Sequence, residues 1–251
     1  MFQELKQKHK ARKWLSELER ARTMPLDQLR ELGQRAGELR GHLNDVISLA
    51  DQRLGLPRIG SSQFPRPKKA DWAWRPEPWR QVMHGIGVAG AESKAQLGNE
   101  LTLFHDCDIS ELTFRQVRNA RESDLAPFGM RMDVFAFDGS YLSLSLALPA
   151  EGAMGLRRNH LIRMNTIIEF EKPIEIFARL NVKHGPNTEH QLRELPLGAD
   201  DVWVEFDLEY TEIVEKWVER MWIDLIFEGP QMNMVTIRDV TLARLPRAEI
   251  G

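Results

Sequence analysis

The chain has 251 residues, of which 42% are hydrophobic, so it can bury a substantial core and is not a disordered protein. The formal net charge of −3 is divided unevenly. Residues 1–99 hold 18 Lys and Arg against 11 Asp and Glu, a balance of +7, whereas residues 100–251 hold 16 against 26, a balance of −10. This asymmetry indicates that the two parts face different partners, although separate solvation of each part explains it equally well.

Neither a membrane protein nor a secreted protein is indicated. No apolar run approaches the roughly 20 residues of a membrane-spanning helix. The amino-terminal sequence MFQELKQKHKARKW is polar and basic and lacks the apolar stretch of a signal peptide. The single cysteine, Cys107, excludes an internal disulfide. We therefore expect a protein made in the cytoplasm without a signal peptide.

The amino-terminal part is expected to be helical. Residues 2–22 are rich in helix formers and contain neither Gly nor Pro, which predicts a first helix. A basic cluster lies near its start: Lys6, Lys8, Lys10, Arg12 and Lys13. Thr23 and Pro25 then fit the cap and the first-turn proline of a second helix.

The second helix, predicted over Leu29–Ala50, has a regular apolar seam. Steps of three and four residues separate its members, as in packed helix pairs and coiled coils: Leu29, Leu32, Ala36, Leu39, Leu43, Val46 and Ala50. An isolated helix of this kind is marginal, so the seam needs either the first helix or a second chain as partner. Because the first helix offers few matching apolar positions, we predict an assembly surface that binds a protein partner and forms a homo-oligomer.

Residues 56–99 lose any regular pattern. Prolines alternate there with Trp72, Trp74 and Trp79, and proline excludes a continuous helix or an inner strand. Three tryptophans are too apolar for a free linker, so this segment should run along a surface and dock its rings there. We therefore expect three parts: a helical arm at 1–55, a connecting segment at 56–99 and a β domain at 100–247.

The remaining sequence has the period of two that is typical of half-buried strands. Six runs show it: Met130–Phe137, Leu142–Leu148, Ile174–Lys183, Val202–Leu208, Met221–Glu228 and Met234–Ala243. Asp138-Gly139, between the first two runs, is a strong hairpin signal because a type I′ turn needs positive φ at both positions. Seven or eight short strands predict a mainly β protein, an antiparallel, jelly-roll-like β-sandwich with an amino-terminal helical arm.

No motif predicts a reaction, a cofactor or a metal. Residues 85–90, GIGVAG, spell a dinucleotide-binding fingerprint, but they follow a proline-rich segment instead of a strand, and no crossover unit surrounds them. Two groups hold residue types that can bind a metal but lack the spacing of known metal sites: His105 with Asp106, Cys107 and Asp108, and His184 with Glu189 and His190. We predict no catalytic, cofactor-binding or metal-binding residue and a non-enzymatic binding or assembly protein.

Two alternatives remain open. The 26 carboxylates after residue 99 leave room for a saccharide-active enzyme that uses a carboxylate pair. The basic arm could instead bind nucleic acid or an anionic membrane surface, with a steep dependence on salt. We predict nucleic acid to be the less favoured partner.

Five residues are candidates for ligand binding. Lys183–His190 reads as an inter-strand loop rich in hydrogen-bonding side chains, among them His184, Asn187 and His190, although turn preferences alone also explain it. Trp203 and Trp222 have the opposite phase to the core residues of their strands. Their rings should stand on an outer sheet face, where a glycan or a protein could stack or another segment could cover them.

Two resemblances add to this interpretation. MWIDLIFEGP at 221–230, followed by VTIRDVTL at 235–242, resembles the closing strand pair of carbohydrate-binding jelly rolls. From Leu101 onward, LTLFHDC, EIFARLNVKHGPNTEH, RELPLG and MWIDLIFEGPQMN resemble an uncharacterised family of Rhodobacter-type alphaproteobacteria. That family is associated with the head-spike proteins of gene transfer agents, phage-like particles that attach to cell-surface polysaccharide. The resemblance implies a structural protein of such a particle, anchored by its helical arm.

Overall fold

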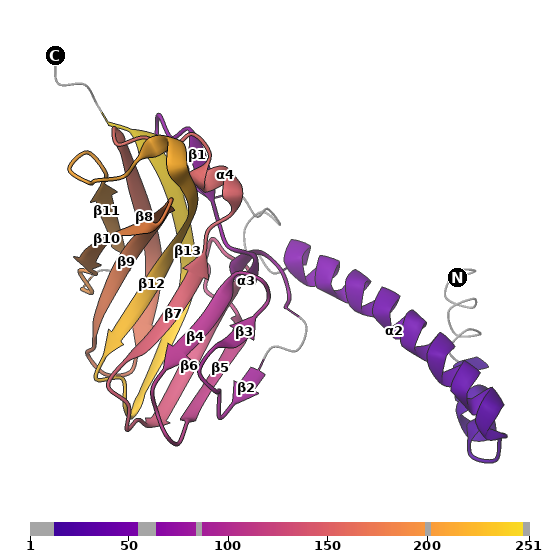
Figure 1. Cartoon of the computed structure of the whole chain (residues 1–251). Helices are drawn as coiled ribbons and strands as arrows, with labels where there is room; N and C mark the ends of the chain where they lie inside the picture. Colours follow the sequence, from indigo (N-terminus) through magenta and orange to yellow (C-terminus); the bar gives the residue numbers. More distant parts are fainter. Residues whose placement is uncertain (1–12, 55–63, 84–86, 199–201, 248–251) are drawn as a thin grey trace. The chain divides into compact units, whose positions relative to one another are not determined.

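The computed structural model describes residues 13–54, 64–83, 87–198 and 202–247, and the chain divides into two compact units, residues 1–48 and 49–251 (Figure 1). Residues 13–21 are helical, and α2 (Leu26–Leu54), most of which belongs to the first unit, begins directly after Pro25. The predicted second helix is therefore confirmed and extends beyond the expected Leu29–Ala50 at both ends. Of the basic cluster, only Lys13 lies within the described residues.

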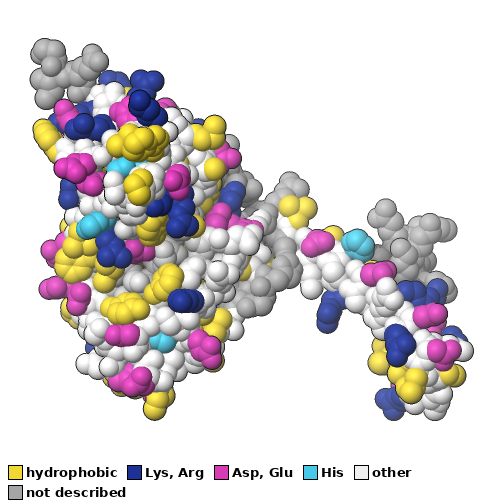
Figure 2. Space-filling model, in the orientation of Figure 1, with side chains coloured by type: hydrophobic (Ala, Val, Ile, Leu, Met, Phe, Trp, Pro, Cys, Tyr) yellow, Lys and Arg dark blue, Asp and Glu magenta, His cyan; other side chains and the backbone are white. Residues whose placement is uncertain are grey.

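The apolar seam of α2 is largely open to solvent. Leu32 is buried and Ala36 is half-buried. The other members of the predicted assembly set are exposed: Leu29, Leu39, Leu43 and Val46. In the view of Figure 2, Lys, Arg, Asp and Glu side chains lie along this part of the chain.

The second unit is a sandwich of two antiparallel sheets (Figure 1). Within the described residues the seven-stranded sheet has the order β11-β8-β13-β6-β5-β2, with β1 also paired to β13. Its strands are β1 (Trp72–Trp74), β2 (Gly87–Ala89), β5 (Glu111–Arg118), β6 (Phe128–Ala136), β8 (His160–Phe170), β11 (Val202–Asp207) and β13 (Asn233–Pro246).

The six-stranded sheet, also counted over the described residues, has the order β10-β9-β12-β7-β4-β3. Its strands are β3 (Ala95–Leu97), β4 (Leu101–His105), β7 (Leu142–Ala147), β9 (Glu175–His184), β10 (Asn187–Glu194) and β12 (Val218–Glu228). Short helices α3 (Glu77–Arg80), α4 (Ala150–Ala153) and η1 (Glu215–Trp217) complete the unit. The predicted fold class, an antiparallel β-sandwich with an amino-terminal helix, is confirmed.

The core lies between the two sheets and follows from the period of two. On β7, Leu142, Leu144 and Leu146 are buried, while Ser143 and Ser145 between them are half-buried on the outer face. All six alternating runs of the sequence lie on strands, at β6, β7, β9, β11, β12 and β13. Burying the apolar face of each strand between the sheets stabilises the fold by about 25 cal/mol for each Å² of apolar surface removed from water.

The predicted Asp138-Gly139 hairpin is wrong. β6 pairs with β5 and β13, whereas β7 pairs with β4 and β12, so this turn carries the chain from one sheet to the other. Gly139 is not among the described glycines with positive φ. Glycine is required there for another reason, because a Cβ would collide with the Asp106 carboxylate and lie 3.0 Å from the Cys107 amide nitrogen. A turn signal specifies a chain reversal but not which strands pair.

Residues 64–99 belong to the β unit. They contribute β1, α3, β2 and β3, and the division between the two compact units lies at 48/49. Trp79 is completely buried, and its indole Nε1 donates to the Ile237 carbonyl over 2.9 Å. Trp72 and Trp74 stack on each other and pack against the core. The tryptophans thus dock as expected, on strands and a helix short enough for the flanking prolines to permit.

Candidate functional site

The two tryptophans predicted to bind ligand lie on opposite outer faces of the sandwich. Trp203 is on β11 of the seven-stranded sheet, with 51% of its surface exposed, and the Arg163 guanidinium stacks 4.9 Å from its ring centroid. Trp222 is on β12 of the six-stranded sheet and is half-buried, between the buried Met221 and Ile223. Both rings have the outward orientation expected from their phase, but they cannot form one site.

The segment predicted as a projecting loop is a tight hairpin, so that part of the interpretation is wrong. Gly185, with φ of 57°, and Pro186 connect β9 to β10, and Asn187 and His190 are strand residues. His184 is buried, and its Nδ1 accepts the Val214 amide over 3.4 Å. Gly, Pro and Asn are typical of loops and of tight turns alike, so the sequence did not reveal the length of the connection. In the structure the turn takes only two residues.

His190 shares the outer face of the six-stranded sheet with Trp222. In the strand register His190 lies opposite Asn181 of β9, which lies opposite Trp222 of β12. Asn187 lies opposite His184 and therefore has the other phase. Of the five predicted residues, only His190 and Trp222 are brought to one surface.

A shallow groove of about 420 Å³ lies on this outer face. Its lining comes from β4, β7, β9 and β12 and the turn before β7: Phe104, Tyr141, Ser143, Ser145, Arg179, Trp222, Asp224 and Ile226. The register explains the arrangement, because Asp224 lies opposite Arg179 on one side and Ser145 on the other. Apolar, aromatic, hydroxyl and charged groups thus converge on one surface, as in sites that bind small polar molecules.

An ion pair forms the polar centre of the groove. Asp224 Oδ2 accepts from Arg179 Nη2 at 2.9 Å, Arg179 Nε at 3.2 Å and Asn181 Nδ2 at 2.9 Å. Asp224 is buried, whereas 43% of the Arg179 side chain is exposed. Among the described residues no donor reaches Asp224 Oδ1, so that oxygen and the exposed guanidinium can bond a ligand. Sequence reasoning missed this pair, whose only signal is polar residues in the outward phase of two strands 45 positions apart.

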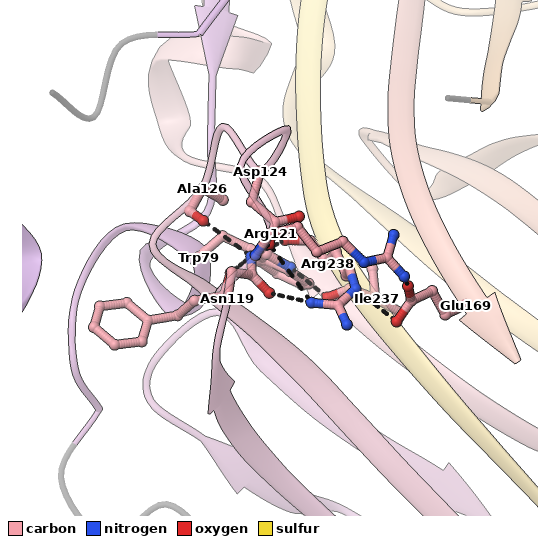
Figure 3. A network of polar contacts seen from close by, with 9 residues as sticks. Trp79, Asn119, Arg121, Asp124, Ala126, Glu169, Ile237 and Arg238 are labelled. Carbon is pink, nitrogen blue, oxygen red and sulfur yellow. Dashed lines mark hydrogen bonds and ion pairs between the residues drawn. The ribbon is translucent and has the colours of Figure 1, made fainter. Parts of the chain in front are cut away.

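A second polar cluster lies at the seven-stranded sheet, and we call it the closed cluster because its side chains bond groups of the same chain (Figure 3). Asn119 Nδ2 lies 2.8–3.0 Å from three carbonyl oxygens, those of Ala126, Phe128 and Arg238. The Arg238 guanidinium contacts Asn119 Oδ1 at 3.3 Å and forms ion pairs with Asp124 and Glu169. Beside it, the Trp79 indole bonds the neighbouring carbonyl of β13 (Figure 3). The hydrogen bonds of Asn119 and the ion pairs of Arg238 hold the 119–127 loop to β13.

The His105–Asp108 segment has a structural role in the turn region. His105 Nε2 lies 2.7 Å from the Ala91 carbonyl, and its Nδ1 accepts the Cys107 amide. Asp106 accepts from the Ser140 hydroxyl at 2.6 Å, the Ser140 amide at 2.7 Å and the Tyr141 amide at 3.0 Å. These hydrogen bonds, the Ser140 hydroxyl foremost, lower the pKa of Asp106, and burial raises the pKa of the Cys107 thiol.

Over the described ranges, no group of three or more His, Cys, Asp or Glu side chains is placed to hold a metal ion. No helix in that part of the chain combines the length and the apolar character that a membrane crossing requires. Of the GIGVAG motif, Gly85 and Ile86 lie outside the described residues, and Gly87–Ala89 forms the edge strand β2.

The model of a family of unknown function, DUF6478, matches residues 1–250. The chain belongs to that family. No curated protein matches the DUF6478 chain. Membership gives no reaction, and the resemblance to gene transfer agent proteins stays a prediction.

Three solved structures are similar to the DUF6478 chain. The family 11 carbohydrate-binding module from Clostridium thermocellum, in complex with a mixed-linked tetrasaccharide, is 12% identical, with 66% of this chain and 99% of that chain covered and a TM-score of 0.41. The C-terminal family 22 module of Clostridium thermocellum Xyn10B is 6% identical, with 71% of this chain and 97% of that chain covered and a TM-score of 0.38. The enzymatically active domain of bacteriophage CBA120 tailspike protein 4 is 7% identical, with 57% of this chain and 19% of that chain covered and a TM-score of 0.42.

The DUF6478 chain thus spans about a fifth of the tailspike domain. At this level of similarity, neither the identity nor the TM-score transfers a ligand to this chain.

Proposed function

We propose that the protein is a non-catalytic glycan-binding protein whose ligand lies across the outer face of the six-stranded sheet. The observation that carries the proposal is that Trp222 lines one groove together with the Arg179–Asp224 pair. A sugar ring has an apolar face that can stack on an indole and a rim of hydroxyls that both donate and accept hydrogen bonds. The groove supplies the indole, a donor in Arg179 and an acceptor in Asp224.

The groove fits binding better than hydrolysis. Glycosidases place two carboxyl groups about 5–9.5 Å apart across the scissile bond. Among the described residues that line this groove, Asp224 is the one carboxylate, and it is hydrogen-bonded to Arg179 and Asn181. Such a carboxylate is suited to holding a sugar hydroxyl, because its charge is already balanced.

A glycan array with the full-length protein tests the proposal. We expect binding to oligosaccharides without release of new reducing ends. Trp222→Ala should weaken binding about 5- to 150-fold, because an aromatic side chain that stacks on a ligand contributes about 1–3 kcal/mol. Trp203→Ala is the matched control, since it removes an exposed tryptophan from the opposite face. Equal loss in both variants, or turnover of the bound glycan, would contradict the proposal.

We also propose that α2 mediates assembly. Within the helical unit, Leu39 and Leu43 of the seam are 37% and 53% exposed, so the stripe lacks a cover there. Replacing both with Asp should reduce the mass measured by light scattering while leaving the β-sheet circular dichroism unchanged. A wild-type protein that is monomeric at micromolar concentrations would contradict this proposal. Incorporation into a phage-like particle stays a prediction from the resemblance alone.

A further inference from the structure

We infer that the glycan is anionic, carrying carboxylate or sulfate groups, and that Lys183 and Arg220 recognise its charge. This inference rests on the proposed function and names the ligand class of the same surface. Lys183 of β9 and Arg220 of β12 lie directly opposite each other in the antiparallel pair. Both have the outward phase of Trp222 and Asn181, so two cations face each other on the proposed binding face. Like charges placed directly opposite destabilise a sheet.

A β-bulge creates this pairing. The register places Val218 opposite His184 and Arg220 opposite Lys183, so Glu219 is the extra residue of β12. Without the bulge, Glu219 would lie opposite Lys183 and form a favourable cross-strand pair of opposite charge. Bulges often change the direction of side chains beside functional sites. This bulge replaces an attractive Glu219–Lys183 pair by a repulsive Arg220–Lys183 pair.

No carboxylate of the described chain compensates the two cations. Neither Lys183 nor Arg220 forms an ion pair with a described residue, and Arg220 contacts the Trp222 ring instead. Asp224 is bonded to Arg179 and Asn181, and Glu219 lines a separate hollow with Gly185 and Trp217. The pair therefore has unused capacity for an external anion.

The position of Arg220 connects this charge to the stacking surface. Its guanidinium carbon lies 5.1 Å from the centroid of the Trp222 ring. A guanidinium can bind a carboxylate or sulfate through two parallel hydrogen bonds, so an acidic sugar at Trp222 would meet a matched donor. The surrounding residues 100–251 carry a charge of −10, which makes a local pair of unpaired cations a specific feature and not part of a generally basic surface.

Matched polysaccharides test this inference with the full-length protein. A uronan and the same polymer with its carboxyl groups reduced to hydroxymethyl groups differ only in charge, and binding to both is measured by affinity electrophoresis at low and high salt. We expect the acidic polymer to bind at least tenfold more tightly at low salt, with the difference shrinking as salt screens the charges. Lys183→Gln and Arg220→Gln should each reduce this preference at least threefold, because each removes one of the two cations. Lys172→Gln, which alters an exposed lysine outside the pair, is the control.

The outcomes separate the two proposals. Equal binding to both polymers, lost in Trp222→Ala but unchanged in Lys183→Gln, overturns the anionic ligand and keeps glycan binding. Binding to neither polymer, together with a negative glycan array, overturns both. Equal binding to polyglutamate or single-stranded DNA that survives Trp222→Ala also overturns the inference, because the surface would then recognise charge without a sugar.

Discussion

Two polar clusters of the β unit differ in what remains available for bonding. In the closed cluster, Asn119 and Arg238 direct their groups at carbonyls and carboxylates of the same chain (Figure 3). In the open cluster, Arg179 and Asp224 bond each other, but part of the guanidinium stays exposed beside Trp222 and no described donor reaches the second carboxylate oxygen. Buried polar groups that satisfy one another stabilise a fold, whereas exposed ones contribute little to stability and can bind a ligand.

Removing Asn119 should have the largest effect on stability. Asn119→Ala leaves three carbonyl oxygens without their shared donor, at a residue that is 2% exposed. We expect the free energy of unfolding to fall by about 2–4 kcal/mol, as measured by urea titration. Glycan affinity at temperatures where the variant is folded should not change. A loss below about 0.5 kcal/mol would mean that the closed cluster does not hold the loop.

Gly129→Ala should have a smaller effect on the same cluster. A Cβ there would lie 3.0 Å from Asn119 Oδ1 and from the Ile237 carbonyl oxygen, which is tighter than side chains normally pack. We expect a loss of about 1–2 kcal/mol from this overpacking. Gly87→Ala on the edge strand β2 is the matched control, because nothing lies within 4 Å of its Cβ position. Equal urea midpoints for the two variants would contradict the close approach.

Asp224→Asn tests the open cluster. The amide can still accept from Arg179, so we expect a loss of only about 1 kcal/mol, in keeping with a pair whose arginine is partly exposed. Glycan affinity should nevertheless fall several-fold, because the charged acceptor for sugar hydroxyls is gone. Calorimetric titration compared with thermal unfolding separates the two effects. A large loss of stability with unchanged glycan affinity would show that the Arg179–Asp224 pair stabilises the fold and does not bind the ligand.

Lys183→Glu should stabilise the protein slightly. Placing a carboxylate opposite Arg220 converts a repulsive cross-strand pair into an attractive one, which is worth about 0.2–1 kcal/mol. The same variant should lose its preference for acidic glycans. A gain in stability with a loss in binding is the sign of a functional pair, whereas a loss in both would indicate that Lys183 is needed for folding.

The fold could largely be predicted because burial of one strand face leaves a local pattern. Leu142, Leu144 and Leu146 alternate with small or polar residues, and that pattern alone indicates a strand. The same pattern placed Trp222 on an outer face. The strand β8 was missed because its buried phase includes His160 and Thr166, which interrupt the apolar alternation.

Pairing between distant strands could not be predicted. Arg179 and Asp224 meet only because β9 and β12 adopt one register, and Lys183 faces Arg220 only because of a bulge. The Asp138-Gly139 signal was misleading for the same reason, since a local turn preference does not reveal which sheet the next strand joins.

The most direct test is to observe the indole signals of the seven tryptophans during a glycan titration, using ¹⁵N-labelled full-length protein and Trp→Phe variants for assignment. We predict that the Nε1–H signal of Trp222 shifts on binding. The signal of Trp203, on the opposite face, and that of the buried Trp79, bonded to the Ile237 carbonyl, should stay in place. A shift of the Trp203 signal with Trp222 unchanged would place the ligand on the seven-stranded sheet and contradict the account.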